Sequence, residues 1–167
     1  SDFEQVIRSC QKIERKDQDG TWITNSMVEA YSSLHLSGYA FSAEAWLDGK
    51  LVGGLYGILL GKVFFGESMF SHASNASKFA FIHWVKLLES KGIELIDCQM
   101  HTPHLESLGA AFVTRKKFME LLNQFMDKQT ILKTAKIVAQ DMDQISQAKN
   151  ITIHMGRKKI PFEMKNN

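Results

Sequence analysis

The feature that most constrains the fold is a change from helical to alternating hydrophobic periodicity at residues 41–47. Apolar and polar side chains alternate there, as they do in a strand with one face against a core. Asp48-Gly49-Lys50 and Gly61-Lys62 have the composition of tight turns, and they bracket a second apolar run at residues 51–60. A third strand is predicted to begin at Val63. Three strands joined by such short turns form an antiparallel meander.

Helical periodicity occurs on both sides of this meander. The predicted helices span residues 2–12, residues 24–37, residues 76–90, a short stretch around residues 104–108 and a stretch that starts near residue 115. Asp2, Thr24 or Asn25, and Asn75 stand where the caps of the first three helices are expected. Residues 94–100 are predicted to form a central strand. The sequence therefore predicts an α+β fold.

Composition restricts the class of protein. The chain has 167 residues, of which 44% are hydrophobic, and a mean hydropathy of −0.17, which suits one globular domain. No stretch approaches the roughly 18–20 apolar residues of a membrane span, so we do not expect a transmembrane protein. Cys10 and Cys98 are far apart and form no C-x-x-C pair, which argues against a zinc ribbon or a disulfide scaffold. Without a signal peptide at its start, the chain is expected in the reducing cytoplasm.

Charge divides the chain near residue 127. Residues 1–126 hold 12 Lys and Arg against 14 Asp and Glu, a balance of −2, whereas residues 127–167 hold 8 against 4, a balance of +4. We therefore predict a folded domain at residues 1–126 and a divergent basic helical tail at residues 127–167. The tail has an apolar seam with helical spacing, formed by Ile131, Ala135, Val138, Met142 and Ile145. Packing of this seam on the domain would leave a monomer, the state we expect, and dimerisation through it is the alternative.

Two acidic positions are unusual for their surroundings. Asp97 lies in the middle of an apolar strand pattern, where Gln99 would share its face. Glu67 is flanked by Phe64-Phe65-Gly66 and Met69-Phe70. A buried carboxylate is costly unless it is paired or takes part in chemistry, so these residues are candidates for a site with an apolar wall and a polar floor. The alternative is a hydrogen bond to a neighbouring strand or loop.

Other chemistries have little support in the sequence. His101 and His104 are three residues apart, but Pro103 intervenes and no further ligand spacing completes a site, so no metal is expected. There is no G-x-S-x-G elbow, no phosphate-binding G-x-x-x-x-G-K and no dinucleotide-type glycine run. Cys98 lies on an apolar strand pattern, which is more typical of a core residue than of a nucleophile.

Six strings in register carry a resemblance to a known family. They are Asp17-Gln18-Asp19-Gly20-Thr21-Trp22-Ile23-Thr24, Gly53-Gly54-Leu55-Tyr56-Gly57, Phe65-Gly66-Glu67-Ser68-Met69-Phe70-Ser71, Asn75-Ala76-Ser77-Lys78, Ile96-Asp97-Cys98-Gln99 and His104-Leu105-Glu106-Ser107-Leu108-Gly109-Ala110. Together they make residues 2–122 resemble the leucyl/phenylalanyl-tRNA–protein transferases. That family also has an N-terminal domain to which no string of this sequence corresponds, so the chain is expected to match the C-terminal domain.

The resemblance implies a fold and an activity. The implied fold is GNAT-like, that is, the acetyltransferase type of mixed sheet with an antiparallel meander flanked by helices, used here without acetyl-coenzyme A or any other cofactor. The implied reaction transfers Leu or Phe, and also Met, from aminoacyl-tRNA to the N-terminal amine of proteins that begin with Arg or Lys. In bacteria this transfer marks the acceptor protein for degradation.

The resemblance also suggests roles for the candidate residues. It puts Asp97 in the role of orienting or deprotonating the amine, with Gln99 beside it, and Glu67 in the role of holding the cationic acceptor or ordering the site. The donor side chain needs a dry, apolar pocket, because Leu, Phe and Met share only their apolarity. Four residues fall at motif positions that could line this pocket: Trp22, Tyr31, Phe64 and Met69.

Binding of tRNA calls for a local basic strip, since residues 1–126 are net negative. Lys78 is a candidate because a helix N-terminus offers backbone N–H groups and a positive dipole end to phosphate. Lys62 in the predicted turn is another. Arg115, Lys116 and Lys117 complete the predicted strip, with a solvated helix start as the alternative reading of these three.

Two other functions remain open at this stage. One is a GNAT-type N-acyltransferase that uses acyl-coenzyme A, although Asn75-Ala76-Ser77-Lys78 stands where that class has its glycine-rich pyrophosphate loop. The other is a non-catalytic RNA- or peptide-binding remnant of the family. The retention of Asp97, Gln99 and Glu67 favours an enzyme over a remnant.

Overall fold

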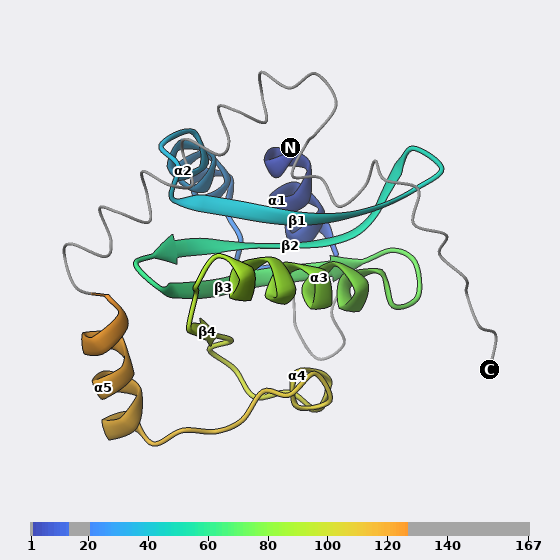
Figure 1. Ribbon diagram of the computed structural model, residues 1–167. Coiled ribbons are helices and arrows are strands. Elements are labelled where there is room, and N and C mark those ends of the chain that lie inside the picture. Colours follow the sequence, from blue (N-terminus) through green and yellow to red (C-terminus); the bar gives the residue numbers. More distant parts are fainter. Residues whose placement is uncertain (1, 14–20, 127–167) are drawn as a thin grey trace.

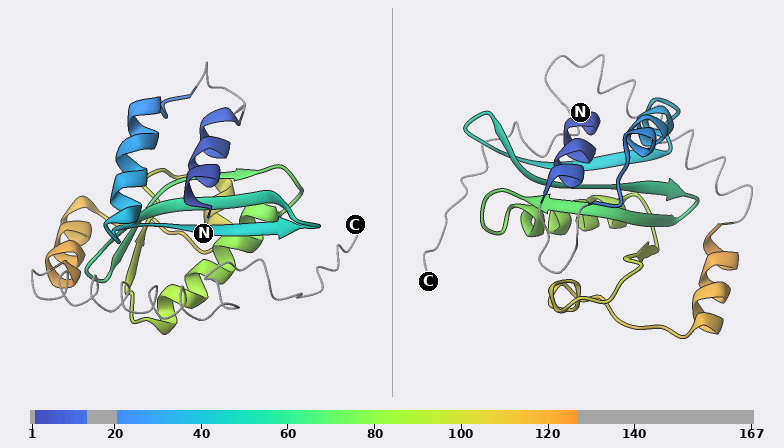
Figure 2. Two further views of the ribbon diagram at one scale, coloured as in Figure 1. Left: turned by 90° about the horizontal axis from the view of Figure 1, so that it is seen from above. Right: turned by 180° about the vertical axis from the view of Figure 1, so that it is seen from behind.

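The structure, a computed structural model, describes residues 2–13 and 21–126. Two helices lie on one face of a four-stranded sheet, and a third helix lies on the other face (Figures 1 and 2). In chain order the elements are α1 (Phe3–Lys12), α2 (Asn25–Leu36), β1 (Ala40–Leu47), β2 (Lys50–Leu60), β3 (Val63–Ser71), α3 (Ala76–Ser90), β4 (Leu95–Asp97), α4 (Pro103–Glu106) and α5 (Arg115–Phe125).

The sheet is mixed. Its strand order is β1-β2-β3-β4, with antiparallel pairing through the meander and parallel pairing of β3 with β4. Asp48 and Gly49 form the β1–β2 turn with φ values of 49° and 74°, a left-handed conformation that Asp tolerates and Gly adopts freely. The α+β class and the GNAT-like arrangement of a mixed sheet with an antiparallel meander flanked by helices are confirmed.

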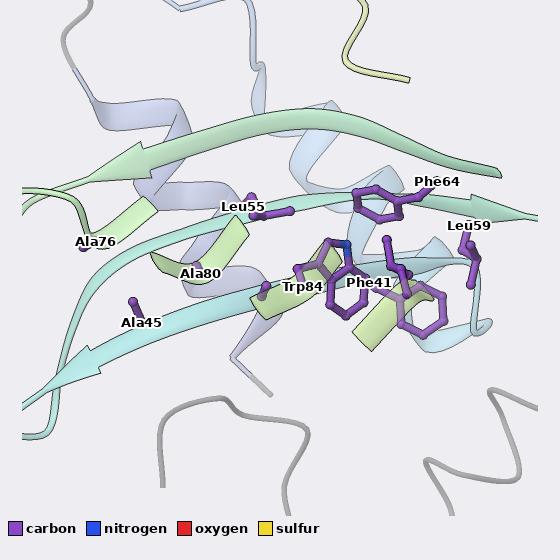
Figure 3. Close-up of a cluster of buried hydrophobic side chains, with 10 residues drawn as sticks. Phe41, Ala45, Leu55, Leu59, Phe64, Ala76, Ala80 and Trp84 are labelled. Carbon is purple, nitrogen blue, oxygen red and sulfur yellow. The ribbon is translucent and has the colours of Figure 1, made fainter. Parts of the chain in front are cut away.

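Each face of the sheet has its own hydrophobic cluster. On the α3 face, Phe64 and Trp84 meet edge to face with their ring centroids 5.3 Å apart, and Phe41 lies beside them (Figure 3). On the face covered by α1 and α2, Tyr56 and Phe70 pack with the apolar side of α1. Full burial of each such side chain contributes about 1.5–3 kcal/mol. Because both faces are covered, the polar residues of the alternating pattern on β1, Ser42 and Glu44, are buried as well.

The first helix is anchored by a buried carboxylate. Glu44 on β1 is 1% exposed, and its Oε1 accepts hydrogen bonds from the backbone N–H of Asp2 at 3.0 Å and from the Ser42 hydroxyl at 3.1 Å. Its Oε2 accepts one from Trp46 Nε1 at 3.1 Å. The prediction that the side chain of Asp2 caps α1 is therefore wrong, since Asp2 contributes its backbone to Glu44 and makes no side-chain cap bond.

Capping elsewhere follows the prediction only in part. Thr24 caps α2, because its hydroxyl accepts from the backbone N–H of Met27 at 3.2 Å. Asn75 precedes α3 with φ 61° and makes no side-chain cap bond, so its role is a left-handed backbone turn. The predicted tail at residues 127–167, including its apolar seam, lies outside the described residues, as do Asp17 to Gly20 of the first motif string.

The chain beyond β4, residues 98–126, forms an arm that contains α4 and α5. No residue of the arm is buried. Its last helix is tied back to the β2–β3 turn, where the backbone N–H of Lys62 donates to the carbonyl of Phe125 at 2.9 Å. Among the residues that the structure describes, no helix has the length and apolar character needed to cross a membrane.

Candidate functional site

The candidate site lies at the end of the β3–β4 ladder, where β4 stops and β3 continues. The parallel ladder pairs Val63 with Leu95 and ends with the pair of Phe65 and Asp97, whereas β3 continues to Ser71. Glu67 follows two residues after the last paired position of β3. The structure therefore brings Glu67 and Asp97, two predicted catalytic residues from distant parts of the sequence, to the same opening of the sheet.

Glu67 occupies a β-bulge. Tyr56 on β2 pairs with Ser68, but the next residue, Gly57, pairs with Gly66. Glu67 is therefore the extra residue of β3 and has no paired residue on β2. Bulges of this kind redirect a side chain and increase the local twist of the strand. The carboxylate of Glu67 is half-buried at this point.

Tyr31 of α2 reaches the same carboxylate. Burial raises the pKa of the Tyr31 hydroxyl well above its usual value of 10.0, and the charge of Glu67 and a hydrogen bond with Glu67 raise it further. A neutral phenol that donates to a carboxylate accounts for all three effects. The ring of Tyr31 packs edge to face on Tyr56, with centroids 5.2 Å apart, so α2 holds Tyr31 against the strand opposite the bulge.

Asp97 and Gln99 meet in a different way from the one predicted. The strand ends at Asp97, and Gln99 has φ 59°, so the prediction of a strand over residues 94–100 with these two side chains on one face is wrong. Instead, Asp97 Oδ1 accepts a hydrogen bond from the backbone N–H of Gln99 at 2.8 Å. Aspartate commonly forms such local turns, and this one ends the ladder early.

Cys98 has the properties of a thiol rather than a thiolate. Burial raises its pKa, and the neighbouring charge of Asp97 raises it further. A raised pKa keeps the sulfur protonated at neutral pH, which disfavours nucleophilic catalysis by this residue. In the part of the chain that the structure describes, no group of three or more His, Cys, Asp or Glu residues is arranged to hold a metal ion.

The four predicted pocket residues do not converge. Phe64 has no exposed surface and lies in the α3-face cluster, against which Met69 also packs. Tyr31 packs on the opposite face of the sheet with the α1–α2 cluster. Trp22 precedes α2 and is 44% exposed. In this conformation Phe64 is a core residue, and its aromatic character alone could not have distinguished that role from a pocket wall.

The predicted cationic strip is also divided. Lys62 and Arg115–Lys117 lie at opposite ends of α5, whose 11 residues span about 16 Å. Lys62 forms an ion pair with Glu94 at 3.4 Å, and Lys117 forms one with Glu120 at 3.8 Å. Lys78 lies in the first turn of α3, which packs on Gly53 near the other end of β2 from the Gly61 turn. Lys78 is thus remote from the other four cations.

Sequence reasoning missed the link between Tyr31 and Glu67. Tyr31 is predicted only as a pocket residue, and its partner Glu67 is 36 positions away, so no local pattern connects the two. The bulge also had no recognised signature, although Gly57 stands opposite it. A strand glycine can mark a bulge or a close approach of backbone, and this was the available clue.

Comparisons with known proteins identify the family of the chain. Residues 1–123 match the family described as leucyl/phenylalanyl-tRNA protein transferase. A protein of that name from Nitrosospira multiformis is 56% identical over 125 residues, which cover 75% of this chain and 53% of the relative. Its namesake from Chromobacterium violaceum is 52% identical over 124 residues, covering 74% and 53%. One from Christiangramia forsetii is 56% identical over 123 residues, covering 72% and 58%.

These matches cover most of this chain but leave much of each relative unmatched. The chain spans about half the length of the curated relatives it matches. The matched part holds the bulge at Glu67, the end of β4 at Asp97 and Tyr31 of α2, the three residues that form the candidate site. On the extent and the identity of these matches, the chain belongs to the leucyl/phenylalanyl-tRNA–protein transferase family.

Proposed function

We propose that this chain carries the aminoacyl-transfer site of its family. In this proposal Leu, Phe or Met is transferred from aminoacyl-tRNA to the N-terminal amine of a protein that begins with Arg or Lys, which marks that protein for degradation. The observation that carries the proposal is that Asp97 ends the β3–β4 ladder opposite Phe65, two residues before Glu67 on β3, in a chain 56% identical to a relative of that name.

The reaction needs few groups from the enzyme. The aminoacyl ester is already activated, so neither ATP nor a covalent enzyme intermediate is required. The acceptor amine attacks the ester carbonyl, a C–N bond forms, and the C–O bond to the terminal ribose breaks. The amine loses a proton and the departing ribose oxygen gains one. The enzyme has to align the two reactants, help move the proton and stabilise the oxyanion.

Asp97 is the proposed group that orients or deprotonates the amine. Its carboxylate is fixed by the backbone N–H of Gln99, so it meets the acceptor in one orientation. The same turn keeps Gln99 directly beside it, with an exposed side chain. A carboxylate held in this way gains catalytic effect mainly through alignment, since little entropy remains to be lost when the amine arrives.

Glu67 is the proposed partner of the positively charged acceptor terminus. Its hydrogen bond with Tyr31 fixes the carboxylate without neutralising it, because a phenol with a raised pKa stays protonated. When the first residue of the acceptor is Arg or Lys, its side chain carries a second positive charge in addition to that of the terminal amine. Two carboxylates at one opening favour such an acceptor over a neutral or acidic one.

The apolar pocket for the donor side chain is proposed beside Glu67. Phe64 and Met69 come from either side of Glu67 on β3 but pack on the α3 face, away from the contact of Glu67 with Tyr31, so their predicted role as pocket walls rests on their motif positions alone. Tyr31 then acts through Glu67 rather than as a pocket wall, and Trp22 remains a predicted pocket residue from its motif position. An apolar pocket without hydrogen-bonding demands explains tolerance for Leu, Phe and Met together.

The proposed partner, aminoacyl-tRNA, belongs to the cytoplasmic translation machinery, so we infer a cytoplasmic protein. Lys62 and Arg115–Lys117 are proposed to contact its phosphates along α5, with Lys78 as a separate contact. We infer that the chain acts as a monomer, because the proposed site is formed by residues of one chain.

Transfer of radiolabelled Leu tests the proposal. We expect label from Leu-tRNA to appear on a protein with N-terminal Arg and not on the same protein with an acetylated N-terminus. Leucyl-coenzyme A should not replace Leu-tRNA as donor. Transfer from the coenzyme A ester would establish the acyl-coenzyme A alternative, and binding of charged tRNA without transfer to any acceptor would establish the non-catalytic alternative.

A further inference from the structure

We propose that Gly57 is a positioning residue for Glu67. The missing side chain at Gly57 allows β3 to bulge, and the bulge directs the Glu67 carboxylate to Tyr31 and to the opening beside Asp97. This inference rests on the proposed function, because it assigns Gly57 a role through a residue of that site.

The first observation is the pairing of the strands. Gly57 is the first residue of β2 after the register changes, and its Cα partner on β3 is Gly66. Tyr56, the preceding residue, pairs with Ser68. The extra residue between the two partners is Glu67. Gly57 therefore lies on the partner strand directly at the bulge.

The second observation is that β3 reverses its faces across the bulge. Phe64 belongs to the cluster under α3, whereas Phe70, six residues later, belongs to the cluster under α1 and α2. In a regular strand, residues an even number apart point to the same face. Both side chains are buried, at 0% and 2% exposure, so each cluster depends on the reversal. The bulge is thus required by the packing of both faces.

The third observation explains why residue 57 is a glycine. A Cβ on Gly57 would lie 2.2 Å from the carbonyl oxygen of Phe65 and 2.5 Å from Cζ of Phe64. Gly57 does not have a positive φ, so the requirement is for space and not for a left-handed backbone. The carbonyl contact involves backbone, which a change of side-chain rotamer cannot relieve. A larger residue at position 57 must therefore move the Phe65–Gly66 segment that leads into the bulge.

The fourth observation connects this segment to the candidate site. Tyr31, which hydrogen-bonds Glu67, packs on Tyr56, the residue immediately before Gly57. Tyr56 is fully buried, so Tyr31 is held in place relative to β2. A shift of β3 against β2 then changes the distance between the Tyr31 hydroxyl and the Glu67 carboxylate.

Gly54 provides a matched control on the same strand. A Cβ on Gly54 would lie 2.7 Å from the carbonyl oxygen of Ala43 and 3.2 Å from Cε1 of Phe70. Gly54→Ala therefore also introduces a backbone clash, at 2.7 Å rather than 2.2 Å, but between β2 and β1 and not at the register change of β3. The two substitutions separate general damage to the sheet from displacement of Glu67.

The experiment compares Gly57→Ala, Gly54→Ala and Glu67→Gln with the wild-type chain. The first readout is the ring resonance of Tyr31 in ¹³C-tyrosine-labelled protein, assigned with Tyr31→Phe. We expect Gly57→Ala to shift this resonance as Glu67→Gln does, and Gly54→Ala to leave it unchanged. The second readout is Leu transfer, where misplacement of a reacting group by about 1 Å costs on the order of 100-fold in rate. Gly57→Ala should lower kcat by about that factor, and Gly54→Ala should not.

A double variant tests whether the effect passes through Glu67. If Gly57 acts only by positioning Glu67, then Gly57→Ala combined with Glu67→Gln should be no slower than the slower single variant. Losses that multiply would assign the effect of Gly57 to another group, such as Asp97, and would overturn the proposal. An unchanged Tyr31 resonance in Gly57→Ala would also overturn it.

Two outcomes would complicate this comparison, and each has its own test: Gly57→Ala does not fold, or the wild-type chain is inactive. If Gly57→Ala alone does not fold, the pair Gly57→Ala and Phe64→Leu relieves the side-chain clash and keeps the backbone clash, so the Tyr31 resonance of that pair decides the matter. If the wild-type chain transfers no Leu, the proposed function fails, yet the Tyr31 resonance still shows whether Gly57 sets the position of Glu67. A shifted resonance with undiminished transfer would overturn the positioning role alone.

Discussion

Two regions of the described chain differ in how far their residues are buried. The sheet region comprises the sheet and its three helices, up to residue 97, and the arm comprises residues 98–126. The sheet region holds every buried residue of the described chain, and most of the apolar ones belong to two clusters, one on each face of the sheet. The arm holds none, and it leaves Phe112 79% exposed and Met100 68% exposed. In the sheet region, therefore, packing determines which residues are acceptable. In the arm, packing determines very little, and the residues there are open to selection for binding to other molecules.

The candidate site lies at the boundary between the two regions. The position of Glu67 is determined by the packing of β3, whereas the position of Gln99 is determined by the turn with which the arm begins. Asp97 is the last residue of the sheet region and bonds to the first turn of the arm. A change of the arm against the sheet would therefore move Gln99 relative to Glu67 and leave Glu67 in place.

The largest expected effect is on the stability of the sheet region. Phe64→Ala should lower the free energy of unfolding by about 3–5 kcal/mol, because it leaves a cavity between α3 and the sheet. The matched change in the arm is Phe112→Ala, where an exposed ring is removed and the expected effect is within about 0.5 kcal/mol. Urea titration of both variants measures the difference. Equal effects would show that Phe112 is packed in solution or that Phe64 is not.

The second effect is on catalysis at the boundary. Asp97→Asn should reduce Leu transfer by on the order of 100-fold or more while the fold survives, because the ionised carboxylate and not its volume is required. Initial rates at saturating charged tRNA measure the loss, and thermal unfolding checks the fold. Asp48→Asn is the control, since Asp48 lies in the exposed β1–β2 turn and Asn tolerates its left-handed backbone. A rate near that of wild type would make Asp97 a structural residue.

Local sequence patterns predicted the meander of the sheet region well and the end of β4, where the arm begins, poorly. Alternation at residues 41–47 and turns at Gly49 and Gly61 specified the meander, because strand pairing through short turns is a local matter. The strand at β4 was overestimated, since the hydrogen bond from Gln99 to Asp97 that ends it competes with the ladder and leaves no trace in hydrophobic periodicity.

The bulge and its consequences depend on distant parts of the chain. Phe64 and Phe70 both look like strand residues facing a core, and only the presence of clusters on both faces shows that they point in opposite directions. The contact of Tyr31 with Glu67 exists because α2 packs on the face to which the bulge turns the carboxylate. Such information resides in tertiary packing, which overrides local preference.

The third effect concerns the arm alone. Replacing Arg115, Lys116 and Lys117 by Ala should weaken binding of uncharged tRNA and reduce the slope of log affinity against log salt by about 1 for each phosphate that the variant no longer binds. A control variant of equal charge change replaces Lys50, Lys86 and Lys91, which belong to the sheet region. Coinciding slopes for the first variant and wild type would mean that the start of α5 is not the tRNA surface.

The smallest effect returns to the sheet region and to Tyr31. The pKa of its hydroxyl is raised above 10.0 by burial and by Glu67, so the unfolded chain releases this proton at a lower pH than the native protein does. Below about pH 10 both states hold the proton and stability is unaffected. Above it the native state binds more protons, so the free energy of unfolding falls as pH rises. Tyr31→Phe removes this loss, and urea titrations from about pH 8 to about pH 11 should give it a flatter profile than wild type. Glu67→Gln removes the charge but not the burial, so its profile should lie between the two. If wild type and Tyr31→Phe lose stability equally, Tyr31 is not held by Glu67 in the folded protein. The contact between these two residues, on which the contrast between a packed sheet region and an open arm most specifically depends, would then be absent.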